Sequence, residues 1–506
     1  MNLHKISQRK AGVILSYVAQ GIHILSSLLY TPIMLRLLGQ SEYGLYQLVQ
    51  SVVAYLGVLS FGFSSSYIRF YSRFKAKDNQ EEIARLNGMF MSIFLAISCV
   101  CILCGTVMIF NIENVFSTGL TASEYTTARI LMALMVLNLA LTFPNSVFDS
   151  YTTAHEQFLY QKVIVILQYV LNPFITLPLL LMGHGSVAMV LVTTALTFSK
   201  LLLNMTYCLK KLNMRFIFRG FQISLLREMW VFTFFIFINL IVDQINWSVD
   251  KFLLGRFAGT VAVAIYGVGG QLNTMYLQLS SSISTVFIPK VNRIVAETDD
   301  NRQLTKLFTE VGRIQFMILA LALSGFTFFG KVFIKLWAGS NYGVSYNIAL
   351  LLMIPVTIPL IQNLGIEIQR AKNMHKARSI VYLLIAISNI FVSIPCIKQW
   401  GASGAAIGTA LTLLLGNGLF MNWYYHRRIG LDIIYFWKQI LSFVPAFIVP
   451  AICGVLIQKY FDINNFIVFI VVASLYVCVY SISIWCFGMN TSEKQMVLKT
   501  FGRLHR

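Results

Sequence analysis

Long apolar runs alternate with short polar segments along almost the whole chain. A helix needs about 20 mostly apolar residues to cross a bilayer. Runs of that length, each ended by charged residues or by Gly, Asn or Pro, predict fourteen membrane-spanning helices. They are expected at residues 11–33, 44–67, 87–110, 126–150, 163–182, 186–208, 230–250, 260–285, 314–330, 347–368, 379–397, 404–425, 439–457 and 466–488. The pattern therefore predicts an all-α integral membrane protein.

Composition agrees with this class. Of the 506 residues, 57% are hydrophobic and only 11% are charged, whereas a soluble domain carries roughly 25% charged residues. The net charge of +20 would suggest nucleic-acid binding in a soluble protein. Here the basic residues lie in short loops between apolar runs, so membrane topology explains them better and no nucleic-acid partner is expected.

The basic residues also predict the orientation. With the N-terminus inside, the inner segments hold 30 of the 39 Lys and Arg residues, and the outer segments hold 7. The other two, Arg129 and Lys200, lie within spans. Because Lys and Arg favour cytoplasmic loops, we expect a multi-pass protein of the cytoplasmic membrane with both termini in the cytoplasm.

The two halves of the chain resemble each other at a nearly constant offset. Leu38-Gly39 corresponds to Leu254-Gly255 at an offset of 216 residues. At an offset of 217, Ala154, Asn172 and Pro178 correspond to Ala371, Asn389 and Pro395. A six-span unit repeated in the same orientation is typical of transporters that move two bundles about a central site. We therefore predict a lobe at residues 1–222, a second lobe at 223–428, and two additional helices with a tail at 429–506.

The seventh predicted span carries a stripe of polar residues. Asn239, Asp243, Asn246 and Asp250 are spaced i, i+4, i+7 and i+11, which puts them on one helix face. Such a stripe can join helices, but two carboxylates are costly for that role alone. A cavity lining is therefore favoured, with Asp243 or Asp250 as a site for H⁺ or Na⁺.

Further ionisable residues lie in or near other spans. Asp149, near the inner end of the fourth span, is a third ion-coupling candidate, although an interfacial position explains it equally well. Lys200 is the most deeply placed cation. Arg36, Lys251 and Arg256 lie near outer span ends, where they line a vestibule or are simply interfacial.

The chain contains no P-loop, dinucleotide-binding fingerprint or zinc motif. Neither ATP hydrolysis nor covalent catalysis is therefore expected, and the protein is predicted not to be an enzyme and to need no cofactor or metal. Transport would then be driven by an ion gradient or by the membrane potential. A membrane-embedded glycan polymerase or transferase is disfavoured because the predicted outer loops are short.

Three stretches resemble the polysaccharide transport family. The first has Pro32 late in the first span, LRLLG at 35–39 and EYGLYQL at 42–48; the others are VDKFLLGRFAGTVAVAIYGVGGQL at 249–272 and GASGAAIGTALT at 401–412. Members of this family are flippases for O-antigen and other lipid-linked oligosaccharides. They belong to a superfamily with the multidrug and toxic-compound extrusion exporters and the lipid II flippase. The resemblance implies two pseudo-symmetric six-helix lobes with two extra C-terminal helices.

The resemblance also implies a function. An undecaprenyl-diphosphate-linked oligosaccharide would move from the inner to the outer leaflet of a bacterial cytoplasmic membrane by alternating access, for lipopolysaccharide or another surface polysaccharide. Glycosyltransferases and a polymerase of that pathway are the expected partners. The candidate substrate-binding residues are Arg36, Lys200, Asn239, Asn246, Lys251 and Arg256. The alternative is an ion-coupled exporter of small amphipathic or cationic compounds with the same fold.

Overall fold

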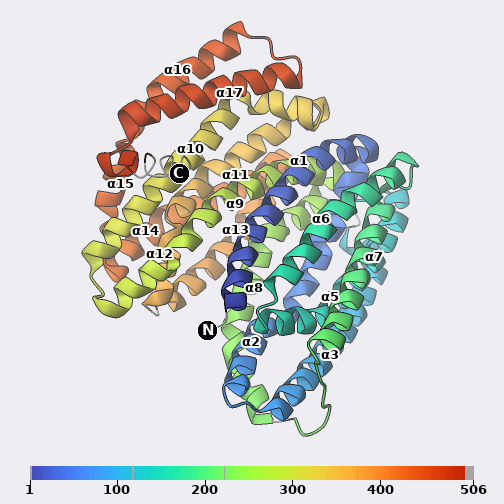
Figure 1. Cartoon of the computed structure of the whole chain (residues 1–506). Helices are drawn as coiled ribbons and strands as arrows, with labels where there is room; N and C mark the ends of the chain where they lie inside the picture. Colours follow the sequence, from blue (N-terminus) through green and yellow to red (C-terminus); the bar gives the residue numbers. More distant parts are fainter. Residues whose placement is uncertain (1–2, 117–118, 222, 373, 496–497, 499–506) are drawn as a thin grey trace. The chain divides into compact units, whose positions relative to one another are not determined.

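The computed structural model describes residues 3–116, 119–221, 223–372, 374–495 and 498. Over these residues the chain forms helices and loops without a β-strand (Figure 1). The α-helices are α1 (Leu3–Ala54), α2 (Phe63–Lys75), α3 (Gln80–Phe110), α4 (Ile112–Val115), α5 (Ala122–Ala154), α6 (Phe158–Leu181), α7 (Gly185–Thr206), α8 (Ile223–Phe257), α9 (Gly259–Glu297), α10 (Asn301–Trp337), α11 (Val344–Ile361), α12 (Asn363–Ala371), α13 (His375–Leu413), α14 (Asn422–Tyr424), α15 (Ile433–Leu441), α16 (Val444–Tyr460) and α17 (Phe466–Ser483).

Ten helical stretches of the described chain are long and apolar enough to cross a membrane, which confirms the all-α membrane class. Two of them, Leu15–Lys75 and Ile380–Ile429, each contain two predicted spans. A glycine with positive φ, Gly39 (φ 73°) or Gly401 (φ 54°), separates the two spans in each case. The predicted spans 230–250 and 260–285 coincide with α8 and α9, which are not among the ten. Polar residues interrupt both helices and lower their hydropathy.

The helices divide into two compact units. Unit 1 comprises Met1–Gly267 and Ile397–Ala402, and unit 2 comprises Val268–Cys396 and Ser403–Arg506. Within unit 1, α1 packs along α6, and α5 packs against both α3 and α7 (Figure 1). Within unit 2, α10 packs against α11 and against the C-terminal helices α15, α16 and α17. The lobe boundaries predicted at residues 222 and 428 stay a prediction.

The repeat seen in the sequence is also present in the hydrogen bonds inside each unit. In α6, the hydroxyl of Thr176 donates to Oδ1 of Asn172 at 3.4 Å. In α13, Ser393 donates in the same way to Asn389 at 2.8 Å. Both residues of the second pair lie 217 positions after those of the first. The two units therefore contain the same helical module.

A second equivalent pair shows where the repeat changes register. In unit 1, Asn204 donates to Oδ1 of Asn145 at 2.9 Å. In unit 2, Gln362 is bonded to Oδ1 of Asn422 at 2.7 Å. The offset is 217 residues from Asn145 to Gln362 but 218 from Asn204 to Asn422. The π-helical segment η4 (Leu414–Met421) precedes Asn422, and its wider turn takes up the one extra residue.

Arg313 of α10 fixes the C-terminal segments to unit 2. Its Nε and Nη2 donate to the two carboxylate oxygens of Glu493 at 2.6 and 3.0 Å, and Nη2 also donates to the carbonyl of Gly488 at 2.9 Å. Nη1 donates to the carbonyl of Gln439 at 2.7 Å and to Oγ of Ser442 at 2.9 Å. The side chains of Arg313 and Glu493 are 4% and 8% exposed. Each N–H group of the buried guanidinium therefore has an acceptor.

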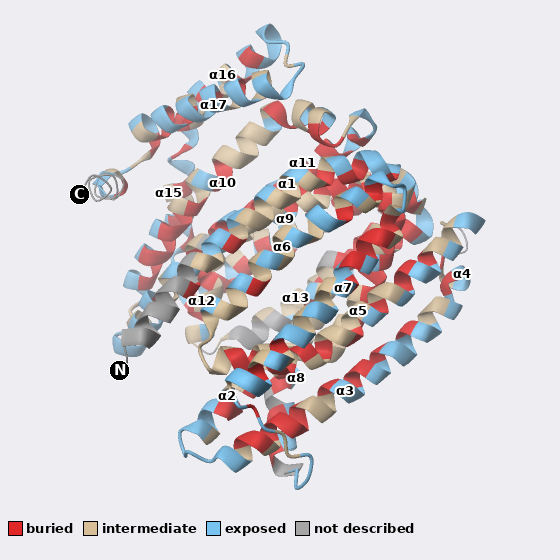
Figure 2. Cartoon of the chain, turned by 45° about the vertical axis from the view of Figure 1, so that its right-hand side comes forward, coloured by how far each residue is buried: buried red, intermediate tan, exposed pale blue. Residues whose placement is uncertain are grey.

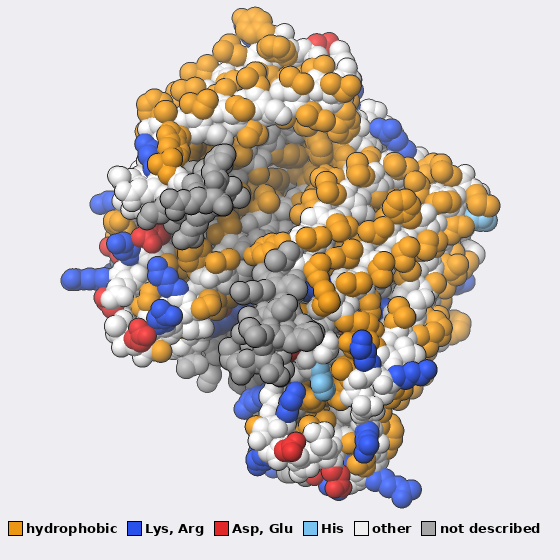
Figure 3. Space-filling view, viewed as in Figure 1, with side chains coloured by type: hydrophobic (Ala, Val, Ile, Leu, Met, Phe, Trp, Pro, Cys, Tyr) orange, Lys and Arg blue, Asp and Glu red, His pale blue; other side chains and the backbone are white. Residues whose placement is uncertain are grey.

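Apolar side chains cover much of the outer surface. Figure 2 shows α16 and α17 exposed along most of their length, and their exposed residues include Ile448, Ile452, Ile467 and Val471. In Figure 3 hydrophobic side chains cover the sides of the helices, while most Lys, Arg, Asp and Glu side chains gather toward helix ends. A surface this apolar suits contact with lipid rather than with water.

Candidate functional site

Charged and amide side chains meet between α5 and α7 of unit 1. Nζ of Lys200 lies 2.9 Å from Oδ2 of Asp149, and the two side chains are 21% and 36% exposed. Asn145 donates to Oδ2 of Asp149 at 2.9 Å, and Asn204 donates to Oδ1 at 2.8 Å. We call these four residues the α5–α7 polar cluster. The carboxylate of Asp149 thus receives three donors, one of them charged.

The α5–α7 polar cluster joins two residues to which the sequence gave separate roles. Asp149 was predicted to couple an ion and Lys200 to attract an anion, and the structure pairs them with each other. Asn204 was missed, although it lies one turn after Lys200, as Asp149 lies one turn after Asn145. Because the charges neutralise each other, each can serve a ligand only by exchanging its partner.

The four residues of the α8 stripe lie in different environments. Asp250 is buried, at 1% exposure, and accepts a hydrogen bond from the hydroxyl of Tyr266 of α9 at 2.6 Å. Asp243 is exposed and Asn246 is partly buried. The side chain of Asn239 lies outside the described residues. The predicted cavity-lining and ion-coupling roles of this stripe stay predictions.

Lys251 is joined to α1. Its Nζ donates to Oε1 of Gln47 at 2.7 Å, and Nε2 of Gln47 donates to the hydroxyl of Tyr43 at 2.9 Å. Arg36 and Arg256 are exposed, and the guanidinium of Arg256 lies 5.8 Å from the centre of the Phe257 ring. Their predicted contact with substrate also stays a prediction.

Glu124, at the start of α5, connects α1 and α9. Its Oε1 accepts hydrogen bonds from Ser41 at 2.5 Å and from Thr260 at 2.8 Å. Nearby, α1 approaches α9 so closely that a Cβ atom on Gly44 would lie 1.8 Å from the carbonyl oxygen of Thr260. This contact requires glycine, because any side chain would separate the two backbones.

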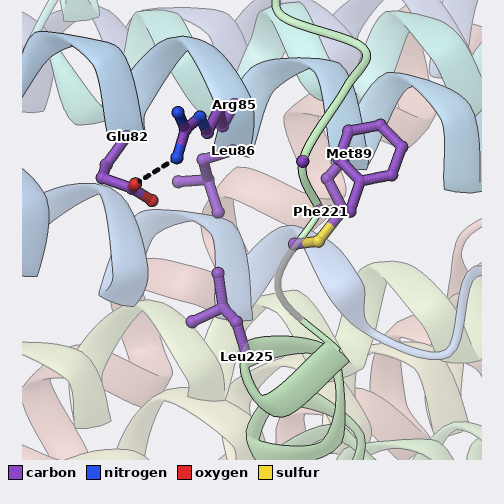
Figure 4. A pocket seen from close by; sticks show the side chains of 7 residues that line it. Glu82, Arg85, Leu86, Met89, Phe221 and Leu225 are labelled. Carbon is purple, nitrogen blue, oxygen red and sulfur yellow. Dashed lines mark hydrogen bonds and ion pairs between the residues drawn. The ribbon is translucent and has the colours of Figure 1, made fainter.

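A small pocket lies between α3 and the segment that leads into α8 (Figure 4). Leu86, Met89 and Leu225 form much of its wall. The guanidinium of Arg85 is bonded to Glu82 at 2.9 Å and to Glu81 at 2.5 Å. Its charge is thus compensated within α3, and the pocket does not resemble a site for an anion or a glycan.

Curated relatives share low identity over much of the chain. A proposed O-antigen transporter of Shigella flexneri is 20% identical over 399 residues, covering 77% of this chain and 91% of the relative. The uncharacterized membrane protein EpsK of Bacillus subtilis is 22% identical and covers 95% of each. The probable flippase AglR of Haloferax volcanii is 23% identical over 35% of this chain and 38% of the relative.

Solved structures share the fold at still lower identity. The lipid II flippase MurJ, in an inward closed conformation, matches with a TM-score of 0.72 and 14% identity, covering 94% of this chain and 98% of MurJ. An inward-facing MATE family transporter of the MOP superfamily matches with a TM-score of 0.65 and 12% identity, covering 84% and 99%. The predicted fold is thereby confirmed.

The family is established from the sequence itself. The polysaccharide biosynthesis protein family matches residues 10–295, which is more than half of the chain. This range includes two of the three stretches whose resemblance was noted above, at 32–48 and 249–272. The chain belongs to the polysaccharide biosynthesis protein family.

Proposed function

We propose that the chain is a flippase that moves an undecaprenyl-diphosphate-linked oligosaccharide from the inner to the outer leaflet of a bacterial cytoplasmic membrane. The observation that carries this proposal is the α5–α7 polar cluster, a charged pair within membrane helices of a protein built from two repeated modules. Intramembrane charges in such a protein mark a substrate or ion route. Family membership and the roles named for the relatives from Shigella flexneri and Haloferax volcanii support the same function.

The substrate chemistry explains the assigned roles. The diphosphate needs cations, for which Lys200, Arg36, Lys251 and Arg256 are the candidates. Sugar hydroxyls need amides such as Asn239 and Asn246. The polyprenyl tail stays in lipid.

Energy for the outward step comes from two sources in this proposal. An inside-negative potential favours outward movement of an anion by about 2.3 kcal/mol per charge per 100 mV. Binding of H⁺ or Na⁺ at Asp149, Asp243 or Asp250 biases the protein between inward- and outward-open states, because an ion shifts this equilibrium by its differential affinity. The excess of basic residues in the predicted inner segments supports cytoplasmic termini.

The direct test is reconstitution of the purified chain into lipid vesicles. Vesicles contain a fluorescent undecaprenyl-diphosphate-linked oligosaccharide in both leaflets, and a membrane-impermeant quencher reports the fraction that reaches the outer leaflet. We expect quenching of the inner-leaflet pool in vesicles with the protein and not in empty vesicles. Asp149→Asn should slow it strongly.

The same vesicles test the exporter alternative. Efflux of a cationic amphipathic dye is measured with an imposed proton or sodium gradient. Dye movement without glycolipid movement would refute the proposed function and support the exporter.

A further inference from the structure

The repeat makes two places in the molecule directly comparable. In unit 1, Nε2 of Gln161 donates to Oγ1 of Thr152 at 2.7 Å across the turn between α5 and α6. At an offset of 217 residues the equivalent positions in unit 2 hold Arg378 and Gln369. Both turns have the same length, since α5 ends at 154 and α6 begins at 158, while α12 ends at 371 and α13 begins at 375. A neutral hydrogen bond in one unit is thus replaced by a cation and an amide in the other.

Gln369 is fully buried, at 0% exposure. Among the described residues, neither Nε2 nor Oε1 of its amide has a hydrogen-bond partner. A buried amide without partners costs about 1–3 kcal/mol, so a glutamine held in this way is unusual in a purely structural position. Its polar atoms are available to a ligand.

Arg378 is partly buried, and its Nε has no partner among the described side chains. Its guanidinium lies 4.5 Å from the centre of the Tyr382 ring. Neighbouring cations differ, because Arg370 pairs with Glu367 at 2.8 Å and Lys372 with Asp299 at 2.7 Å. The described part of the chain offers Arg378 no carboxylate within ion-pair distance.

Polar aromatic side chains stand beside these two residues. Tyr425 packs against Gly365, one turn before Gln369 on the same face of α12, and it lies close enough to Arg378 and Tyr382 for an electrostatic interaction. The hydroxyl of Tyr382 donates to Asn417 at 2.5 Å. Arginine, amide and phenol groups together provide several donors in one small region of unit 2.

We propose that Arg378 and Gln369, assisted by Tyr425, bind the phosphate oxygens of a lipid headgroup, and that this headgroup is the diphosphate of the transported lipid. A guanidinium presents parallel N–H donors that match a phosphate group, and the charged hydrogen bonds formed are strong. The Tyr382 ring orients the guanidinium from below. Because Arg378 has no carboxylate partner, a phosphate would meet an uncompensated positive charge, which the α5–α7 polar cluster does not offer. The choice of lipid rests on the proposed function.

Binding is measured on the full-length protein in detergent, as the rise of the thermal unfolding midpoint with ligand concentration. The probes are undecaprenyl diphosphate, phosphatidylglycerol and uncharged undecaprenol. Arg378→Gln should weaken undecaprenyl diphosphate binding by roughly tenfold or more, since charged hydrogen bonds are lost. Arg378→Lys should retain part of the affinity, because it keeps the charge but loses the planar fork.

Gln369→Leu separates binding from folding. It should also weaken undecaprenyl diphosphate binding, while the unliganded protein stays as stable as the wild type or becomes more stable, because an unpaired buried amide has been removed. Arg370→Gln is the matched control and should bind like the wild type, since its side chain is 63% exposed and paired. Undecaprenol binding should be the same in all four variants.

Wild-type affinity for undecaprenyl diphosphate in Arg378→Gln and Gln369→Leu would overturn the proposal. If only phosphatidylglycerol depends on Arg378, the phosphate site stands and its assignment to the transported lipid is refuted. Flipping is scored separately in vesicles. Binding that depends on Arg378 in a protein that does not flip the glycolipid would support this site and refute the proposed function.

Discussion

Replacing Arg313 by methionine should release the C-terminal segment from unit 2. Methionine keeps the apolar stem of the side chain but removes every donor to Glu493, Ser442 and the two backbone carbonyls. Glu493 then keeps its charge at a position that is 8% exposed. Removing one partner of a buried ion pair typically costs about 3–5 kcal/mol.

This cost predicts how often the segment opens. Because about 1.4 kcal/mol corresponds to a factor of ten in an equilibrium, the open population should rise by roughly two to four powers of ten. Lys494 lies in the segment that would be released. Trypsin cleavage after Lys494, followed by mass spectrometry on the purified protein, reports this population while opening is fast relative to cleavage.

Two further variants make the reasoning refutable. Arg370→Met removes an exposed partner of Glu367, a pair worth about 0–1 kcal/mol, and should leave cleavage after Lys494 unchanged. Arg313→Met combined with Glu493→Leu should restore much of the protection, because no unpaired charge remains buried. Cleavage of Arg313→Met at the wild-type rate would show that the buried pair does not hold the segment.

Two other predictions concern unit 1. Asp149→Asn should cost at most about 1 kcal/mol of stability because the pair with Lys200 is partly exposed, yet it should strongly slow glycolipid flipping in vesicles; unchanged flipping would remove Asp149 as a functional residue. Gly44→Ala should lower the thermal unfolding midpoint, because its Cβ would lie 1.8 Å from the Thr260 carbonyl oxygen. Gly21→Ala, with no atom within 4 Å of the added Cβ, is the neutral comparison, and equal midpoints for the two variants would contradict the close approach.

The helices and the repeat could be predicted because both are written locally in the sequence. Apolar length alone locates the spans, and Asn172 and Asn389 lie at the same position of the same module. Pairing across the fold could not be predicted. Asp149 and Lys200 are 51 positions apart, and only the packing of α5 on α7 brings them together.

Charge near a span end also had more than one meaning. Arg313 was predicted to be an ordinary inner-side cation, but segments more than a hundred residues later bury it. Helical spacing correctly puts Asp243 and Asp250 on one face of α8, but it carries no information on what packs there. One of them is buried and the other is exposed because different neighbours surround each end of the helix.

The π-helical segment at Leu414–Met421 has a practical consequence for work on relatives of this protein. An alignment of the two halves without a gap pairs Asn204 with Met421 rather than with Asn422, and one position on a helix is a rotation of about 100°. Every later comparison between the halves would then concern side chains on different faces. Chimaeras that exchange the halves should therefore be joined before Leu414, or carry a one-residue deletion after it.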